Sequence, residues 1–163
     1  MSEAPPGFDE LVASLDYPLF VVTVASGGER SGCLVGFATQ CSIKPPRVLV
    51  CLSVKNHTYG VAADATHLGV HALRPDDRAL AERFGGETGD EIDKFADIEW
   101  RAGPAGAPLL HGPAWFVGRI LDRVDLGDHV GHVLEPVAVG RADALDEQLG
   151  FQEAKDIDPG HEP

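Results

Sequence analysis

The chain has 163 residues, of which 44% are hydrophobic and 24% are charged, and its formal net charge is −13. This length can bury a core of its own, and the composition is far from that of a disordered chain. The negative charge disfavours nonspecific binding to nucleic acid or to an anionic membrane, and the sequence has no run of about 18 apolar residues that could form a membrane helix.

The first elements expected are a short helix and a β-hairpin. Apolar side chains at positions 8, 11, 12 and 15 have helical spacing, which predicts an amphipathic helix over residues 8–15. Residues 19–24 are apolar and β-branched, and residues 31–39 resume this character after Gly27 and Gly28, which predicts a hairpin.

The middle of the chain alternates between strands and helices. Residues 48–52 are five consecutive apolar residues after Pro45 and Pro46, which favours a strand covered on both faces. Asn56 can cap a helix that continues to residue 65. A strand over residues 68–73 and a second helix over residues 76–84 follow, and Gly85 and Gly86 are expected to end that helix.

The last third of the chain contains an irregular segment, two strands and a tail. Residues 87–110 are rich in glycine, proline and charge, and we expect most of them to cross the surface. Residues 114–126 and 129–139 predict two closing strands joined at Gly127 and Asp128. We expect residues 1–140 to form a single domain and the acidic residues 141–163 to be a partly ordered tail.

Short turns between most of the strands favour a mainly β fold, a closed or nearly closed antiparallel barrel. The sequence has no G-x-G-x-x-G after a strand, so a Rossmann fold lacks its main support. Three cysteines without a C-x-x-C pair, and an N-terminus without a secretory signal, predict a reduced, cytoplasmic protein. Seven histidines give no clear set of three ligands, so we predict no metal site.

Residues 53–58 join a predicted buried strand to the start of a helix. Backbone N–H groups, the hydroxyls of Ser53 and Thr58, the amide of Asn56 and the charge of Lys55 could together hold an anion such as a phosphate. Residues 18–75 also carry only two acids against five bases. An ordinary capped helix with solvated polar residues is the alternative interpretation.

Residues 35–42 form a second candidate site. A glycine late in a strand, here Gly36, often marks a bulge or a close approach of the backbone to a ligand. A planar ring could lie there, with backbone N–H groups and Gln40 reaching its polar edge. A simple strand bend before Pro45 and Pro46 is the alternative.

The order of these motifs resembles that of the flavin reductase-like domain family, from about Leu15 to Gly140. The family pattern G-x-T-x-S-S-F-x-S-V-S-x-x-P-P-x-V-x-V corresponds to residues 32–42 followed by residues 45–50. Residues 53–58, 68–73, 93–95, 108–110 and 127–129 match further parts of the pattern in the same order.

The resemblance implies a Greek-key-like, six-stranded antiparallel split barrel that binds FMN, possibly FAD, and forms a homodimer with the flavin near the subunit interface. It implies that residues 35–41, among them Val35, Gly36, Phe37, Ala38, Gln40 and Cys41, line the flavin ring and ribityl chain. It implies that the phosphate is held by Ser53, Lys55, Asn56, His57 and Thr58. His129 occupies the position associated with nicotinamide, and we predict that it is the catalytic-site residue.

The chain departs from the family pattern at two places. Gly36, Phe37 and Ala38 replace S-S-F, so two hydroxyls that commonly contact flavin are missing, and His71 stands where asparagine is usual. The first hypothesis is an NAD(P)H-dependent flavin reductase that serves a partner monooxygenase or another electron acceptor. The alternatives are a non-catalytic flavin-binding electron carrier and a split barrel that binds haem or deazaflavin.

Overall fold

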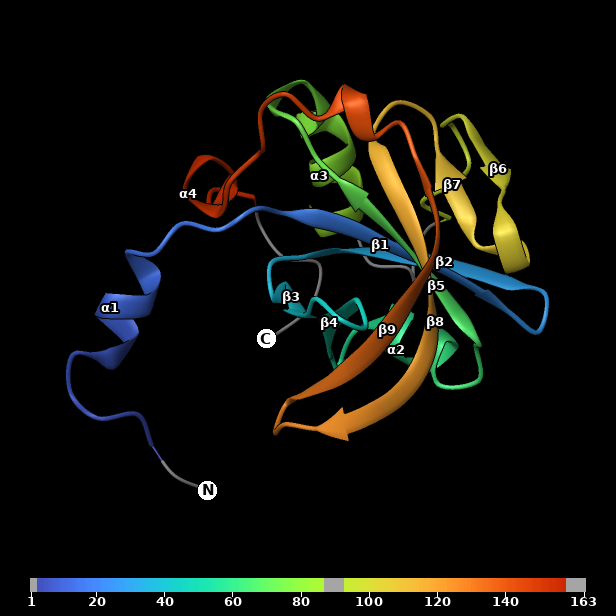
Figure 1. Ribbon diagram of the computed structural model, residues 1–163. Coiled ribbons are helices and arrows are strands. Elements are labelled where there is room, and N and C mark those ends of the chain that lie inside the picture. The colour runs from blue at the N-terminus through green and yellow to red at the C-terminus, as the bar shows by residue number, and fades with distance from the viewer. Residues whose placement is uncertain (1–2, 87–92, 158–163) are drawn as a thin grey trace.

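The computed structural model describes residues 3–86 and 93–157 and is dominated by one curled antiparallel sheet (Figure 1). Its seven strands lie in the order β2-β1-β5-β8-β9-β4-β3. Their bounds are β1 Phe20–Ser26, β2 Glu29–Val35, β3 Ala38–Ser42, β4 Arg47–Ser53, β5 His67–Ala72, β8 Ala114–Asp125 and β9 His129–Gly140. The mainly β, antiparallel fold class is confirmed.

The number and closure of the strands differ from the expected six-stranded barrel. Residues 31–39 do not form one strand, because the chain leaves β2 after Val35 and enters β3 only at Ala38. β2 and β3 therefore lie at opposite edges of the seven-stranded sheet. The sheet curls, but β2 and β3 are not paired with each other, so the barrel is not closed.

The helices are short and lie mostly where the sequence predicts them. They are α1 Phe8–Ala13, α2 His57–Ala62, α3 Arg78–Gly86 and α4 Phe151–Ala154, with 3-10 turns at Pro75–Asp77, Pro104–Gly106 and Ala142–Ala144. The predicted cap of α2 is confirmed, since Asn56 Oδ1 accepts a hydrogen bond from Thr58 N at 2.8 Å. α3 includes Gly85 and Gly86 instead of stopping before them.

The core lies on both faces of the sheet, which explains the uninterrupted apolar runs. Val22, Val24, Val50, Leu52 and Leu134 pack together inside the curl. A second cluster outside the curl packs α3 and the C-terminal segment against β1, with Val21, Leu73, Phe84, Phe95 and Leu149 at its centre. β1 can therefore be apolar at consecutive positions and bury the side chains of residues 21–24 on both faces of the sheet.

The segment expected to cross the surface instead contributes to the core within its described part, residues 93–110. Phe95 is 3% exposed and packs edge-to-face on Phe84, and Lys94 donates hydrogen bonds from Nζ to the carbonyls of Gly32 and Phe84. β6 (Trp100–Ala102) and β7 (Pro108–Leu110) form a hairpin beside β5 and β8. Glycine and proline between these apolar residues hide the periodicity that would have predicted a packed segment. Residues 87–92 lie outside the described chain.

The described part of the predicted tail, residues 141–157, packs against the body of the protein. Leu19 N donates to Leu149 O, and Leu149 N donates to Leu73 O, both at 2.9 Å. Phe151 then stacks on Tyr17, with ring centres 4.8 Å apart. Residues 158–163 lie outside the described chain. The C-terminal segment thereby places the Phe151 ring against Tyr17, which precedes β1.

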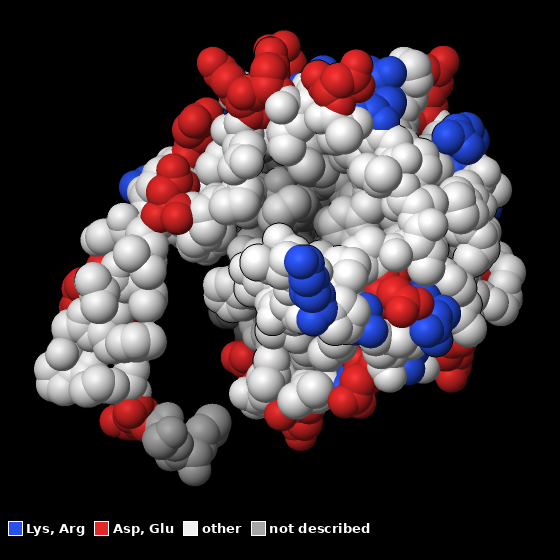
Figure 2. Space-filling view, in the orientation of Figure 1, with Lys and Arg blue, Asp and Glu red and all other residues white. Residues whose placement is uncertain are grey.

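The first helix stands apart from this body. Figures 1 and 2 show α1 held away from the sheet, with open space between the two. Gln152 fixes the end of the connection, since its Nε2 donates to the carbonyls of Ala13 and Leu15, each at 2.8 Å. None of the described helices is long and apolar enough to cross a membrane.

Candidate functional site

A cavity of about 330 Å³ opens where β2 turns into β3, beside the end of β4 and the start of β9. Both chain ends reach it, because the residue before β1 and the start of α4 form one of its sides. Its lining consists of Tyr17, Leu19, Cys33, Leu34, Val35, Gly36, Phe37, Cys51, Leu52, Ser53, Asn56, His129 and Phe151. Most of this surface is apolar, and the polar groups lie on the β4–α2 loop and at the start of β9.

Aromatic rings form much of the wall. Tyr17 stacks on Phe151 with 15° between the ring planes, and its ring centre lies 6.3 Å from that of Phe37. Phe37 in turn lies 5.2 Å from the His129 ring and is 55% exposed. An apolar cavity edged by aromatic faces and a few polar groups suits a flat ring system.

Gly36 is required for this wall for a reason the sequence does not reveal. A Cβ atom at position 36 would lie 2.4 Å from Cε2 of Tyr17 and 3.4 Å from a methyl carbon of Leu19. The expected close approach at Gly36 therefore involves the protein's own tyrosine. The chain bends there, and Phe37 O accepts a hydrogen bond from Cys51 N at 2.9 Å.

The polar end is formed by Ser53, Asn56 and His129. Ser53 pairs with His129 across β4 and β9, and its Oγ accepts a hydrogen bond from Lys55 N at 3.3 Å. His129 Nδ1 lies 2.7 Å from Asp128 Oδ1. This hydrogen bond lowers the pKa of the exposed Asp128 carboxyl, so Asp128 is charged and orients the imidazole.

Burial keeps the cysteine thiols in the wall neutral. Burial raises the pKa of Cys33 to about 11, and burial also raises the pKa of Cys51. Both thiols are therefore protonated at neutral pH and contribute apolar surface.

The structure brings six of the predicted site residues to this cavity: Val35, Gly36, Phe37, Ser53, Asn56 and His129. The other six, which do not line it, are Ala38, Gln40, Cys41, Lys55, His57 and Thr58. Gln40 and Cys41 are exposed on β3. Thr58 is fully buried, with its hydroxyl 2.8 Å from that of Ser31, and His57 Nε2 lies 2.6 Å from a carboxylate oxygen of Glu29.

Seven lining residues were absent from the sequence-based prediction: Tyr17, Leu19, Cys33, Leu34, Cys51, Leu52 and Phe151. Four of them belong to β2 and β4, whose neighbouring positions were predicted. Tyr17 and Phe151 come from opposite ends of the chain. The signal in the sequence was the spacing of Leu145, Leu149 and Phe151, the patterned part of the acidic tail.

The local excess of bases over residues 18–75 does not create a concentrated positive site. Arg47 lies 3.7 Å from Glu135, and Arg74 forms a close pair with Asp77. Acids from other parts of the chain thus accompany several of these bases. Within residues 3–86 and 93–157, no group of three histidine, cysteine, aspartate or glutamate side chains lies together as metal ligands would.

The structure is that of a small, mainly β protein with a curled antiparallel sheet and an apolar, aromatic-walled cavity at its edge. The chain belongs to the flavin reductase like domain family, whose model matches residues 12–156.

Two curated relatives span most of the chain. A ferric-chelate reductase (NAD(P)H) of Archaeoglobus fulgidus is 29% identical over 131 residues, covering 78% of each chain. The FMN reductase (NADH) RutF of Stutzerimonas stutzeri is 28% identical, covering 88% of this chain and 83% of its own. Other relatives are longer: the chain spans 39% of a probable flavin reductase and 52% of a stachydrine N-demethylase reductase subunit, both of Rhizobium meliloti.

Solved structures share the fold. The NADH:FAD oxidoreductase SgcE6 of Streptomyces globisporus superposes with a TM-score of 0.82 at 23% identity, over 94% of both chains. An FMN-binding protein of Thermus thermophilus has a TM-score of 0.78 at 26% identity, over 89% of this chain and 82% of its own.

Proposed function

We propose that this protein is an NAD(P)H-dependent flavin reductase that holds FMN in the cavity between the β2–β3 corner and the C-terminal segment. The observation that carries the proposal is the cavity itself, an apolar pocket walled by Tyr17, Phe37 and Phe151 with Ser53, Asn56 and His129 at one end. It coincides with the part of the chain where the family resemblance places the flavin ring.

The donor set fits an isoalloxazine ring and a phosphate tail. When bound, the flavin supplies the centre that accepts a hydride and passes electrons on. The aromatic walls pack against the ring, and the neutral thiols of Cys33 and Cys51 keep one side of the cavity free of charge. Ser53 and Asn56 lie on the loop that we assign to the phosphate end, with Lys55 between them.

The chain orients a nicotinamide co-substrate through His129. The imidazole is fixed by Asp128 and lies against Phe37 at the cavity, so it can contact nicotinamide or the flavin edge. It is not required to donate a proton in the hydride step. Five further residues remain predicted flavin contacts. For Ala38, Gln40 and Cys41 this would need a movement of β3, and for His57 and Thr58 it would need contacts from the backbone at the start of α2.

The names of the relatives support this chemistry and leave its details open. They include reductases that use NADH or NAD(P)H, and FMN or FAD. HsaB of Rhodococcus jostii is the reductase subunit of a flavin-dependent monooxygenase, and a Salmonella typhimurium relative is the reductase component of 4-hydroxyphenylacetate 3-monooxygenase. A monooxygenase that accepts reduced flavin is therefore the partner we favour, in the cytoplasm.

A flavin-binding electron carrier is the second candidate, and one observation favours it. Gly36 and Phe37 replace the serines of the family pattern beside His129, so two hydroxyls that commonly contact flavin are missing. A carrier would bind flavin stoichiometrically without efficient turnover. Haem or deazaflavin in place of FMN would be recognised from the visible spectrum of the bound cofactor.

Steady-state oxidation of NADH and NADPH with added FMN separates the two candidates. The reductase turns over many equivalents of nicotinamide, and His129→Gln reduces kcat/KM for the nicotinamide while FMN binding changes little. Stoichiometric flavin with negligible turnover would assign the carrier. Gln is the matched choice, because it keeps a polar side chain of similar reach.

We further propose a homodimer in which α1 packs on a second copy of the chain. Phe8, Leu11, Val12 and Leu15 form a helical apolar stripe, and each is between 37% and 60% exposed. A helix of six residues is not stable in water by itself, so a partner surface must cover this stripe. The helix precedes Tyr17, a residue of the cavity wall, by a few positions in the sequence.

A further inference from the structure

A second cavity, of about 540 Å³, lies between the β6–β7 hairpin and the adjoining ends of β8 and β9. It shares no lining residue with the cavity assigned to flavin. Its volume lies within the range of about 300–1,000 Å³ that is typical of small-molecule sites. The proposed flavin reductase activity assigns no role to it.

Both tryptophans of the chain line this cavity. Trp115 on β8 pairs with Gly140 on β9, and a Cβ at position 140 would lie 2.4 Å from atoms of its indole ring. The indole therefore rests on bare backbone. Trp100 on β6 is held by an edge-to-face contact with Phe95 and by the guanidinium of Arg30, 4.5 Å from its ring centre. Trp100 and Arg101 are consecutive on β6 and lie on opposite faces of the hairpin, so the Trp100 indole packs with Phe95, whereas Arg101 lies on the side of Trp115. Trp115 therefore shares the cavity with Arg101, and Trp100 borders it.

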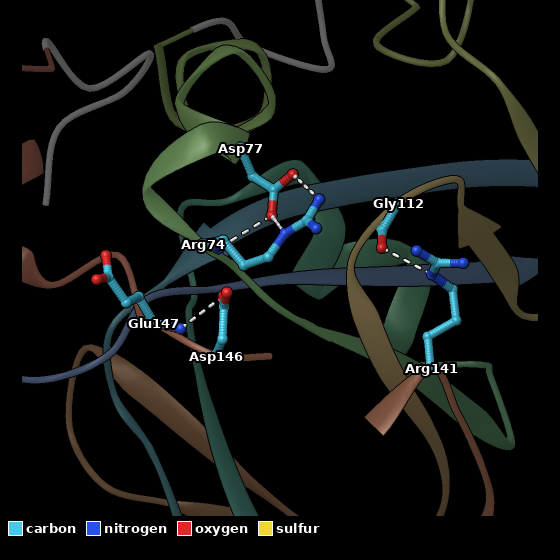
Figure 3. Close-up of polar contacts among 6 residues, drawn as sticks. All are labelled: Arg74, Asp77, Gly112, Arg141, Asp146 and Glu147. Atoms are coloured by element: carbon cyan, nitrogen blue, oxygen red, sulfur yellow. Dashed lines mark hydrogen bonds and ion pairs between the residues drawn. The ribbon is translucent and has the colours of Figure 1, made fainter. Parts of the chain in front are cut away.

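Two arginines supply positive charge to the same cavity. The guanidinium of Arg101 lies 5.9 Å from the ring centre of Trp115. Arg141 donates a hydrogen bond from Nε to the carbonyl of Gly112 at 2.8 Å (Figure 3). Its backbone adopts the left-handed conformation (φ 52°, ψ 32°), which non-glycine residues rarely populate.

Neither of these guanidiniums forms an ion pair within residues 3–86 and 93–157, although the chain contains 26 acidic residues. The contrast with Arg74 is visible in Figure 3. Arg74 donates to both carboxylate oxygens of Asp77, at 2.9 and 3.0 Å, and is neutralised there. The carboxylate in the lining, Glu99, lies 3.6 Å from His111.

We propose that this cavity binds a small planar aromatic ring that carries an anionic group, a carboxylate or a phosphate. The indole of Trp115 supplies an apolar surface for the ring, and Arg101 and Arg141 supply directed N–H donors for the anion. An arginine without an ion pair on an acidic protein attracts an anion, whereas most of the surrounding surface repels one. Two such arginines beside an indole favour a ligand that is both flat and negatively charged.

Tryptophan fluorescence makes the site observable, because Trp115 lies in this cavity and Trp100 borders it. The purified protein is titrated with benzoate and with AMP, excited at the red edge of indole absorption. Cyclohexanecarboxylate, which has the anion without the flat ring, and benzyl alcohol, which has the ring without the anion, are the matched control ligands. We expect saturable quenching by benzoate, by AMP or by both, and at most weak changes with the two controls.

The titrations with benzoate and with AMP distinguish a carboxylate ligand from a phosphate ligand. Quenching by benzoate alone assigns an aromatic carboxylate, and quenching by AMP alone assigns a nucleotide. Replacing Arg101→Gln and Arg141→Gln together weakens the binding by at least about tenfold, since each removes a charge-assisted hydrogen bond. Arg119→Gln, on the same strand as Trp115 but outside this cavity, changes it little.

Arg101→Lys and Arg141→Lys, which keep the charge, lose less affinity than the glutamine variants. They also remain informative if the double variant does not fold, as thermal unfolding would reveal. Absence of saturable quenching with both ligands would overturn the proposal. So would quenching that is unchanged in a folded Arg101→Gln, Arg141→Gln protein.

Discussion

Gly36 sets the shape of the proposed flavin site, since its missing side chain lets Tyr17 approach the backbone. Gly36→Ala would place a methyl group against the Tyr17 ring, which is itself held by its stack on Phe151. We expect a loss of about 1–3 kcal/mol in the free energy of unfolding, as for other insertions into packed space. FMN affinity should fall as well, because the aromatic wall is displaced.

Urea unfolding and FMN titration check this prediction, and Gly60→Ala is the matched control. Gly60 lies in α2 with nothing within 4 Å of its missing Cβ, so alanine there should be neutral or stabilising by up to about 1 kcal/mol. Equal effects of the two substitutions would contradict the role assigned to Gly36.

His71 gives the protein a defined acid sensitivity. It is fully buried on β5, where Nδ1 donates to Val21 O and Nε2 accepts from Leu110 N, each at 3.0 Å, so the neutral ring satisfies both contacts. Burial lowers the pKa of His71 to about 4 from the ordinary 6.5. The unfolded chain therefore takes up this proton first as the pH falls.

The stabilisation from His71 is complete above about pH 6.5 and is lost as the pH falls toward about 4, by about 3 kcal/mol in total. His71→Asn should remove this part of the pH dependence of the unfolding free energy, because asparagine does not titrate. His67→Asn, on the same strand, should leave the pH dependence of wild type. Urea unfolding at several pH values makes the comparison, and a His71→Asn slope equal to wild type would rule out this assignment.

At the scale of elements, the loop between β4 and α2 combines a structural and a proposed binding role. Asn56→Ala removes the cap on Thr58 N, which costs about 0.5–2 kcal/mol, and should also weaken FMN binding. Asn56→Asp keeps an equally good cap but brings a negative charge toward the proposed phosphate position. It should therefore leave the unfolding free energy near wild type while lowering FMN affinity.

Comparing FMN with riboflavin, which lacks the phosphate, tests the second role of this loop. Asn56→Asp should discriminate against FMN and have little effect on riboflavin binding. An equal loss of affinity for FMN and for riboflavin would show that the phosphate does not bind at this loop.

Some helices and strands could be predicted from the sequence, and others could not. The hairpins, the buried β4 and the Asn56 cap follow from local patterns of apolar, turn and capping residues, which act over a few positions. An irregularity at Gly36 was expected, but its neighbour was not, because Tyr17 comes from before β1. Phe95, Leu149 and Phe151 were missed for the same reason, since the surfaces that bury them belong to distant parts of the chain.

The same distinction applies to the candidate site. Its polar end, Ser53, Asn56 and His129, lies in motifs that the sequence displays, whereas its aromatic wall depends on how the two chain ends meet. The predicted contacts of Gln40, His57 and Thr58 came from the family pattern by position. In the structure these side chains are engaged elsewhere.

At the scale of the whole molecule, the exposed stripe on α1 predicts the assembly. We expect the purified protein to have twice the mass of a single chain by size-exclusion chromatography with light scattering. Replacing Leu11→Glu and Val12→Lys together should give a monomer, since both changes put a charge into the apolar stripe. Asp9→Asn, outside the stripe, should leave a dimer. A monomeric wild-type protein would contradict the proposed contact.

We expect the aromatic-walled cavity to hold a flavin that NADH or NADPH reduces. To measure this, the purified protein is titrated with FMN and followed by absorbance, and NADH or NADPH is then added without oxygen. We expect saturable binding of about one FMN for each chain and bleaching of the flavin absorbance at a rate far above that of free FMN. If the protein bound neither FMN nor FAD, the cavity would not be a flavin site.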